Sequence, residues 1–194
     1  MAKFQIQETV INGQDEAVTV RLGAGTGSSN YVTSKEVGKP VKLVGESRFD
    51  LCAAGDPIEA VIVAVENAAQ DDYTLGSIVD EGYKQVTFDG LQATAGTGTV
   101  ALGDYVVAGT AVAKGTALTG PMKVCKATNQ PGAAVVSTIP ATNSAADIKT
   151  AIDAALVLQA SANKNSVHAW RVVSLGTAGT GAVGTTGIVQ RVTC

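Results

Sequence analysis

Hydrophobic and polar positions alternate along most of the chain in short runs, which glycine, aspartate and asparagine interrupt. A period of two is typical of strands with one buried face, and the interrupting residues are typical of tight turns. From Phe49 the pattern predicts a short strand, a turn at Gly55-Asp56-Pro57 and a long buried strand over Ile58–Val65. Further strands are predicted over Tyr73–Val79, Lys84–Phe88, Tyr105–Val107, Met122–Lys126, Ala134–Ser137, His168–Leu175 and Ile188–Val192. Their spacing favours a mainly β protein with an antiparallel β-sandwich or barrel-like core.

The first 45 residues follow a different pattern. Residues 3–11 and 16–22 predict two strands, joined by a turn at Asn12-Gly13. The first strand carries three apolar residues on one face, namely Phe4, Ile6 and Val10. Glycine and serine then break the alternation over residues 23–30. We therefore predict an N-terminal arm or small hairpin over residues 1–45 and a β-rich core domain over residues 46–194.

One stretch of the core has helical periodicity. Apolar residues recur every three or four positions at Ile148, Ala151, Ile152, Ala155 and Leu156. Asn143 or Ser144 can cap the N-terminus of a helix here, and Asp147 falls in the first turn, where a carboxylate favours the helix dipole. The pattern predicts an amphipathic helix over about 144–161, within a helical insertion at about 141–165.

Composition indicates contacts with other proteins. Charged residues make up 16% of the chain, against about 25% in typical soluble domains. A surface with so few charges favours large subunit contacts. The formal net charge is −3 and the basic residues are scattered, which is unsuited to nucleic-acid binding. Apolar runs such as Ala60–Val65 are too short to span a bilayer, and we expect no membrane association.

Reactive residues are few and dispersed. The chain has one histidine, His168, and three cysteines, Cys52, Cys125 and Cys194, which form no C-x-x-C. They are typical of reduced thiols in a protein made in a cytoplasm. No local pattern of metal ligands or of nucleophile and base is present, so we expect no catalytic, cofactor or metal site.

A complete G-x-G-x-x-G occurs at Gly179, Gly181 and Gly184. In a dinucleotide site this motif needs a helix directly after it and an acidic residue about 20 positions further on. Here a β-rich stretch follows and the printed sequence ends at Cys194. We therefore interpret the glycines as a flexible link between two antiparallel strands.

Two further patterns have competing interpretations. The stretch around Met122-Lys123 resembles biotinyl and lipoyl carrier domains, which place a modified lysine at a hairpin tip, but Val124 stands where the second methionine of that motif is expected.

Gly55-Asp56 and Gly103-Asp104 each precede a predicted strand. Shared turn chemistry explains this echo as well as duplication would.

The segment FDLCAAGDPIEAVIVAVENA from Phe49 to Ala68, with GSIVDEG and ALGDYVVAGTAVAKG after it, resembles the capsid decoration (cement) proteins of tailed bacteriophages. The stretch over His168–Val192 is similar to the way such chains close. The resemblance covers roughly Phe49–Lys126 and His168–Val192. Its motifs are Gly-Asp turns and β-rich runs, and the family brings no catalytic residues with it.

The resemblance implies a structural virion protein, made in the host cytoplasm and bound to the outer surface of an assembled phage head. Its implied partners are the major capsid protein and further copies of itself, as a homotrimer that bridges and stabilises capsid subunits. We expect the arm, through Phe4, Ile6 and Val10, to grip a neighbour by strand addition. Two alternatives remain: another virion surface β-protein, such as a head-fibre base or a receptor- or glycan-binding module, and a carrier modified at Lys123.

Overall fold

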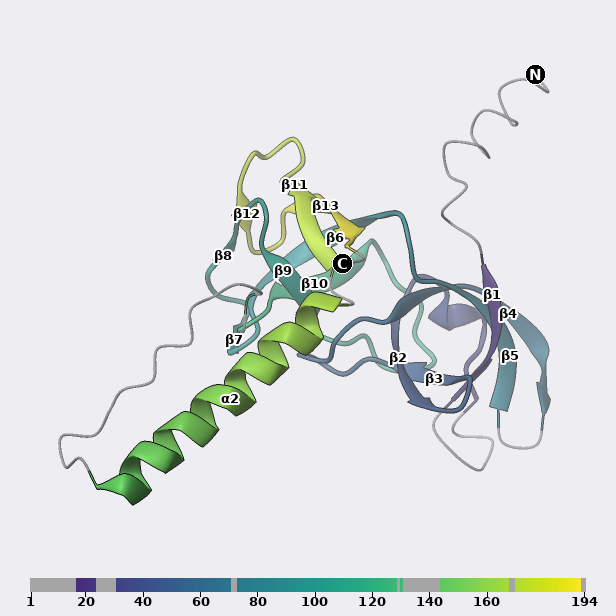
Figure 1. The fold of residues 1–194 in the computed structure, drawn as a ribbon. Coiled ribbons are helices and arrows are strands. Elements are labelled where there is room, and N and C mark those ends of the chain that lie inside the picture. The colour runs from purple at the N-terminus through teal and green to yellow at the C-terminus, as the bar shows by residue number, and fades with distance from the viewer. Residues whose placement is uncertain are drawn as a thin grey trace.

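The structure is a computed structural model that describes residues 17–23, 31–70, 73–128, 130, 144–167 and 170–192. It is mainly β, as the sequence predicts, with two β-structures side by side and one long helix (Figure 1). The elements, in order, are β1 (Val18–Leu22), the short 3-10 helix η2 (Ser34–Glu36), β2 (Pro40–Gly45), β3 (Arg48–Leu51), β4 (Ala60–Gln70), β5 (Tyr73–Val79), β6 (Tyr83–Leu91), β7 (Thr94–Ala95), β8 (Thr99–Val100), β9 (Tyr105–Ala108), β10 (Met122–Lys126), α2 (Ala145–Val167), β11 (Trp170–Ser174), β12 (Gly181–Ala182) and β13 (Thr186–Arg191).

The first β-structure is a closed barrel with the strand order β1-β3-β2-β4-β5. It closes because β1 pairs with β5 in antiparallel fashion and with β3 in parallel. Alternate residues of β1, Val20 and Leu22, point into its core, while Val18 is exposed. The core also contains Val32, Val41, Ala60, Ile62 and Ile78.

The barrel crosses the domain boundary expected at residue 45. Strands β1 and β2 precede that position, yet both hydrogen-bond within the barrel. Residues 17–23 and 31–45 are therefore part of a packed core and not of a separate arm. The predicted strand over residues 3–11, with Phe4, Ile6 and Val10, lies outside the described residues.

The second β-structure is also a ring. Its strand order is β10-β9-β11-β13-β6, and β10 pairs in parallel with β6, which joins the two ends. We call this the second ring; β7 extends it beside β6. Trp170 and Phe88 are the largest fully buried side chains of the protein and lie in its core.

The barrel and the second ring share that core. Three residues from the β3–β4 region, Cys52, Ile58 and Val61, belong to the same buried cluster as Phe88 and Trp170. The Arg191 guanidinium, at the end of β13, donates hydrogen bonds to the carbonyl oxygens of Ile58 and Glu59, at 3.2 and 2.6 Å. The two rings therefore form one body.

One kind of turn recurs through both rings. In the segments 36–39, 53–56, 94–97, 101–104, 113–116 and 182–185, the fourth amide donates to the first carbonyl, and the third residue is a glycine with φ between 80 and 87°. A positive φ at the third position favours glycine because other residues are strained there. We call these segments the glycine turns.

Four glycine turns attach to a neighbouring strand in the same way. The glycine amide donates to a strand carbonyl, and the amide of that same strand residue donates back to the fourth carbonyl of the turn. The strand residues that receive the turns are Ile62, Ala108, Val172 and Phe88. The echo between Gly55-Asp56 and Gly103-Asp104 thus reflects shared turn geometry.

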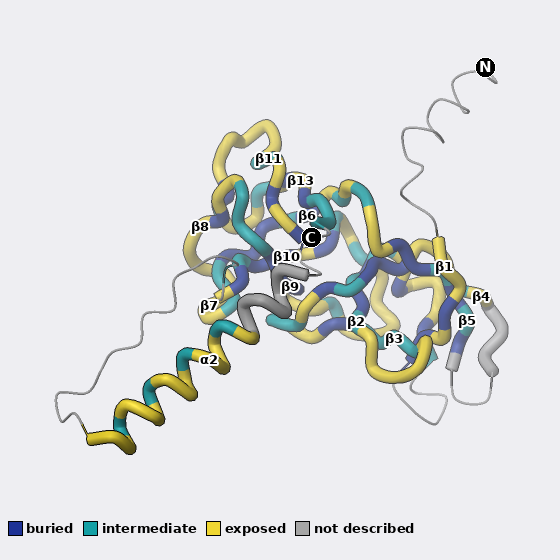
Figure 2. Tube along the Cα trace, in the orientation of Figure 1, coloured by how far each residue is buried: buried dark blue, intermediate teal, exposed yellow. Residues whose placement is uncertain are grey.

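Helix α2 extends away from both rings (Figure 1). Ser144 caps it, since its Oγ accepts a hydrogen bond from the Asp147 amide at 3.2 Å. The predicted helix over 144–161 is confirmed and continues to Val167. No residue from 144 to 160 is buried, as the exposed colouring along the helix shows (Figure 2).

Candidate functional site

The three residues predicted to form an interface, Phe4, Ile6 and Val10, lie outside the described residues, as does His168. The other candidates from the sequence have defined positions.

The glycines of the G-x-G-x-x-G serve close packing and turning. The loop joins β11 to β13, which pair in antiparallel fashion, as predicted. Gly181 lies so close to β8 that a Cβ built on it would stand 1.8 Å from the Val100 carbonyl oxygen. Gly179 and Gly184 have positive φ values of 61 and 84°. No helix begins after Gly184, so the arrangement lacks the helix N-terminus that binds a pyrophosphate.

Cys52 and Cys125 are both buried free thiols. Burial raises the pKa of Cys52 to about 12 and that of Cys125 to about 11. A reactive cysteine needs a lowered pKa, because the thiolate is the nucleophile. With raised pKa values, these two buried thiols have the character of core residues and not of reactive cysteines.

Lys123 lies in the interior of a sheet. It is the second residue of β10, pairs with Thr87 of β6, and its carbonyl accepts from the Gly109 amide. Its ammonium group is 3.8 Å from the Asp89 carboxylate and is about half exposed. Carrier domains present their lysine at a hairpin tip, and Lys123 does not occupy one.

Asp89 is the centre of a small polar cluster beneath Lys123. One carboxylate oxygen accepts hydrogen bonds from the amide and hydroxyl of Thr110, at 2.7 and 2.5 Å. The Cys125 thiol donates to the Asp89 carbonyl at 3.5 Å. Asp89 is only 6% exposed, so these contacts hold β6, β10 and the loop after β9 together.

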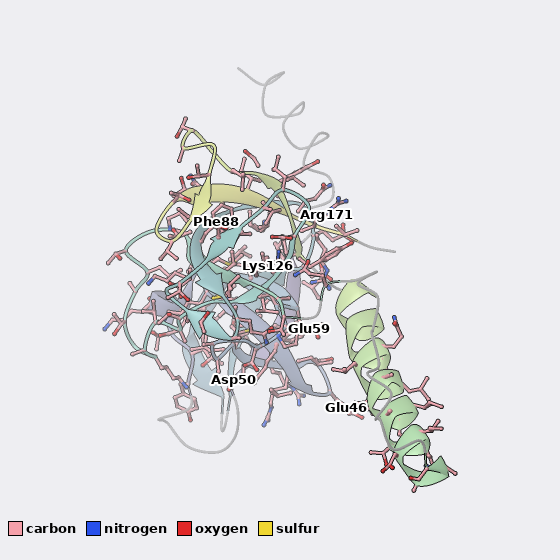
Figure 3. The ribbon with its side chains drawn as sticks, turned by 90° about the vertical axis from the view of Figure 1, so that its left-hand side faces the viewer. Glu46, Asp50, Glu59, Phe88, Lys126 and Arg171 are labelled. Atoms are coloured by element: carbon pink, nitrogen blue, oxygen red, sulfur yellow. The ribbon has the colours of Figure 1, made fainter. Side chains whose placement is uncertain are left out.

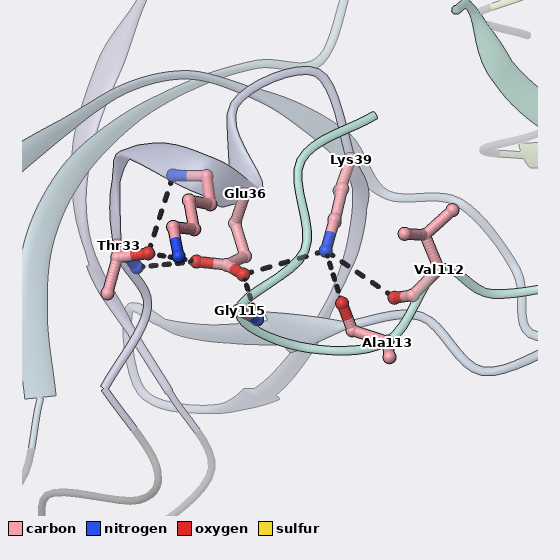
Figure 4. Close-up of polar contacts among 7 residues, drawn as sticks. Thr33, Glu36, Lys39, Val112, Ala113 and Gly115 are labelled. Atoms are coloured by element: carbon pink, nitrogen blue, oxygen red, sulfur yellow. Dashed lines mark hydrogen bonds and ion pairs between the residues drawn. The ribbon is translucent and has the colours of Figure 1, made fainter. Parts of the chain in front are cut away.

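A buried ion pair joins the barrel to a loop of the second ring (Figure 4). Glu36 and Lys39 are 0% and 3% exposed, and their charged groups lie 3.5 Å apart. One Glu36 carboxylate oxygen accepts from the amide and hydroxyl of Thr33, both at 2.7 Å. The other accepts from the Gly115 amide at 2.6 Å. The Lys39 ammonium group donates to carbonyls of the same loop at Val112 and Ala113.

We call this group of contacts the Glu36 clamp. Gly115 belongs to the glycine turn at 113–116, whose glycine amide donates to the Glu36 carboxylate, whereas the glycine amides of the other five turns donate to a strand carbonyl. Burial by itself raises the pKa of Glu36, but the hydrogen bonds from Thr33 and Gly115 and the charge of Lys39 outweigh it and lower the pKa overall. The buried carboxylate is therefore charged and fully bonded.

Sequence reasoning missed the Glu36 clamp. One local signal was available: Thr33-Ser34-Lys35-Glu36 is a capping box, in which Thr33 and Glu36 bond each other's backbone amides at the start of η2. The contact with Gly115 joins residues far apart in the chain, and no local pattern predicts it.

A cavity of about 260 Å³ lies along the seam between the two rings. Its lining is mostly apolar and consists of Val37, Gly38, Val61, Lys84, Gln85, Leu118, Gly120, Pro121 and Met122. A smaller cavity of about 30 Å³, room for about one water molecule, lies beside Cys52 and Lys39. Within the described ranges, no group of three or more His, Cys, Asp or Glu side chains is arranged to hold a metal ion.

Large apolar side chains are exposed on the outside of the protein. On the barrel they include Val18, Leu43, Val44 and Val63, which are 40–54% exposed. On α2 they are Ile148, Ile152, Leu156, Val157 and Leu158, which are 37–69% exposed. Figure 3 shows α2 to one side of the body, with side chains extending on both sides of the helix. Among the described residues, no helix combines the length and the apolarity needed to span a membrane.

Compared with known proteins, the chain matches no family model, no curated protein and no solved structure.

Proposed function

We propose that the protein is a structural component of a virion that binds the outer surface of an assembled phage head and stabilises it by bridging capsid subunits. The observation that carries the proposal is the outward apolar surface of the barrel and of α2. Exposed apolar side chains that lie together, as Ile148, Ile152 and Leu156 do along α2, are typical of protein contact surfaces.

The contacts of the candidate reactive groups also support a structural role. The carboxylates of Asp89 and Glu36 fasten loops to strands, and the thiols of Cys52 and Cys125 are buried in the core. The segments that resemble decoration proteins include the glycine turns at 53–56 and 101–104, which tie one strand to the next. A protein with several such contacts can bridge capsid subunits, because each further contact becomes intramolecular once the first is made.

The proposal is tested by adding the purified full chain to phage heads that lack it. The expected result is saturable co-sedimentation at a fixed ratio to the major capsid protein, together with a higher temperature of head disruption. Heads that bind none of the protein would refute the proposal. Binding to host cells without binding to heads would favour the receptor-binding alternative.

The arm is tested separately. Because Val18–Leu22 form a barrel strand, the deletion must end at residue 16 to leave the barrel complete. We expect removal of residues 1–16 to weaken head binding while the far-UV circular dichroism is preserved. Unchanged occupancy on heads would show that Phe4, Ile6 and Val10 are not part of the contact.

A further inference from the structure

Helix α2 exposes an apolar face that the described residues of its own chain do not bury. The helix has 23 residues, which corresponds to a length of about 35 Å. Isolated helices in water are marginally stable, and most helices in proteins depend on packing of one face. No residue from 144 to 160 is buried, so the described residues do not supply that packing, and the face is available to another molecule.

The exposed apolar residues form a defined ridge. Ile148, Ile152 and Leu156 are spaced four residues apart and lie in a row along one face, with exposures of 37%, 51% and 62%. On one side of this ridge lie Ala151 and Ala155, whose side chains are small. Rows with this spacing interdigitate in the commonest mode of helix packing in globular proteins. The face is therefore suited to another helix.

The charges on α2 argue against a nucleic acid or an anionic membrane as the occupant. Between residues 145 and 160 the helix has one cation, Lys149, and its ammonium group is 2.5 Å from the Asp153 carboxylate. The stretch from 154 to 160 has no charged residue. Binding to phosphates or to anionic lipid requires clustered cations.

We propose that the ridge of α2 packs against the same ridge of a second copy of the protein, with the two helices antiparallel. The ridge is self-complementary about Ile152: a two-fold axis there places Ile152 against itself and Ile148 against Leu156 of the second copy. Lys149 and Asp153 lie together on one flank of the ridge. In the antiparallel pair, that flank meets its own copy, so each Lys149 reaches the Asp153 of the other chain and two symmetric ion pairs border the contact.

This inference does not rest on the proposed function, because the contact forms between two copies in the absence of phage heads. If both hold, the two-fold contact links neighbouring copies across the surface of the head. The following experiments use the purified full chain alone, so their failure would leave the head-binding result intact.

The first test is disulfide cross-linking at residue 152. In a chain with Cys194→Ser, the substitution Ile152→Cys is expected to give a covalent dimer under mild oxidation, because the residue faces itself across the two-fold axis. Val157→Cys is the matched control: it is 69% exposed and lies about 140° around the helix from Ile152. Cys52 and Cys125 are buried and do not compete. Equal yields of dimer from the two variants would overturn the proposal.

The second test measures self-association by sedimentation velocity. Ile152→Glu is expected to weaken association by at least about tenfold, whereas Val157→Glu, which introduces the same charge on the same helix, leaves it unchanged. Circular dichroism checks that both variants keep the helix and the rings. Wild-type protein that remains monomeric at all concentrations, or equal effects of the two variants, would overturn the proposal and indicate a different protein as the occupant of α2.

Discussion

Glu36 is the residue whose replacement should be most costly to the fold. Its buried carboxylate accepts three hydrogen bonds and faces Lys39 at 3.5 Å. Glu36→Gln removes the negative charge that compensates Lys39. It also places the side-chain NH2 group of glutamine, a donor, against the donors of Thr33 or Gly115. We expect a loss of about 3–5 kcal/mol in the free energy of unfolding, measured by urea denaturation.

The matched control for this substitution is Glu46→Gln. Glu46 is exposed, so the same chemical change should alter stability by less than about 0.5 kcal/mol. Equal effects of the two substitutions would mean that the Glu36 clamp contributes nothing measurable.

The Glu36 clamp also predicts a dependence of stability on pH. Because the pKa of Glu36 is lowered in the folded protein, its contribution is complete above the ordinary pKa of glutamate and is lost as the pH falls through the lowered value. The difference in unfolding free energy between wild type and Glu36→Gln should therefore shrink on acidification. Urea denaturation at a series of pH values measures this, and a difference that is constant with pH would contradict it.

Two glycines of one loop should differ sharply in their tolerance of alanine. At Gly181 a Cβ would overlap the Val100 carbonyl, so β12 must separate from β8, and we expect a loss of about 3 kcal/mol. At Gly184 a Cβ meets no atom within 4 Å, and only the positive φ opposes it, at a cost of about 1–2 kcal/mol. Thermal unfolding of Gly181→Ala and Gly184→Ala compares them; equal losses would show that the close approach to Val100 is readily relieved.

At the scale of elements, the glycine turns at 53–56 and 101–104 should contribute equally. In each, the aspartate accepts from the first amide of the turn at 2.7 Å and pairs with a lysine, Lys42 or Lys126. Asp56→Ala and Asp104→Ala should each lower the free energy of unfolding by about 1–3 kcal/mol, mainly through the unpaired amide. Glu46→Ala is the control. A large effect at one turn and none at the other would contradict the equivalence of the two turns.

Local elements were predicted from the sequence more fully than their pairing. Strands β5 and β10 match the predicted Tyr73–Val79 and Met122–Lys126, because alternating residues flanked by turn residues carry a local signal. Strand β2 and the short β7, β8 and β12 were not predicted, and Ala134–Ser137 lies outside the described residues. The parallel pairings of β1 with β3 and of β6 with β10 depend on contacts between distant segments, which alternation does not encode.

The site residues divide in the same way. The structural interpretation of Gly179, Gly181 and Gly184 was predictable, because the β-rich stretch after them is visible locally. The Glu36 clamp was not, because Glu36 and Gly115 meet only in the folded protein. The apolar ridge of α2 was visible in the sequence, but its exposure depends on the direction in which the helix leaves the body.

For the whole molecule, the shared core predicts one cooperative unfolding transition. Arg191 reaches from the second ring to Ile58 and Glu59, and it stacks 5.9 Å from the centre of the Trp170 ring. Trp170 is the only tryptophan, so its fluorescence reports on the second ring, while far-UV circular dichroism reports on both rings. We expect the two signals to give the same midpoint in wild type and to shift down together in Arg191→Ala. Separate midpoints in wild type would show that the rings unfold independently.

The chain positions of the two rings also set an order of events during synthesis. All five barrel strands come from residues 18–79, so the barrel has every partner it needs once that stretch has left the ribosome. The second ring cannot close until β13 is translated. Strand β6 pairs with β10 on one edge and with β13 on the other, and β13 comes last in the chain. Until β13 is made, the edge of β6 that pairs with it has no partner, and the Phe88 ring is not covered by Gly187 of β13. A nascent chain stalled in this interval would be the form of the protein most prone to aggregate.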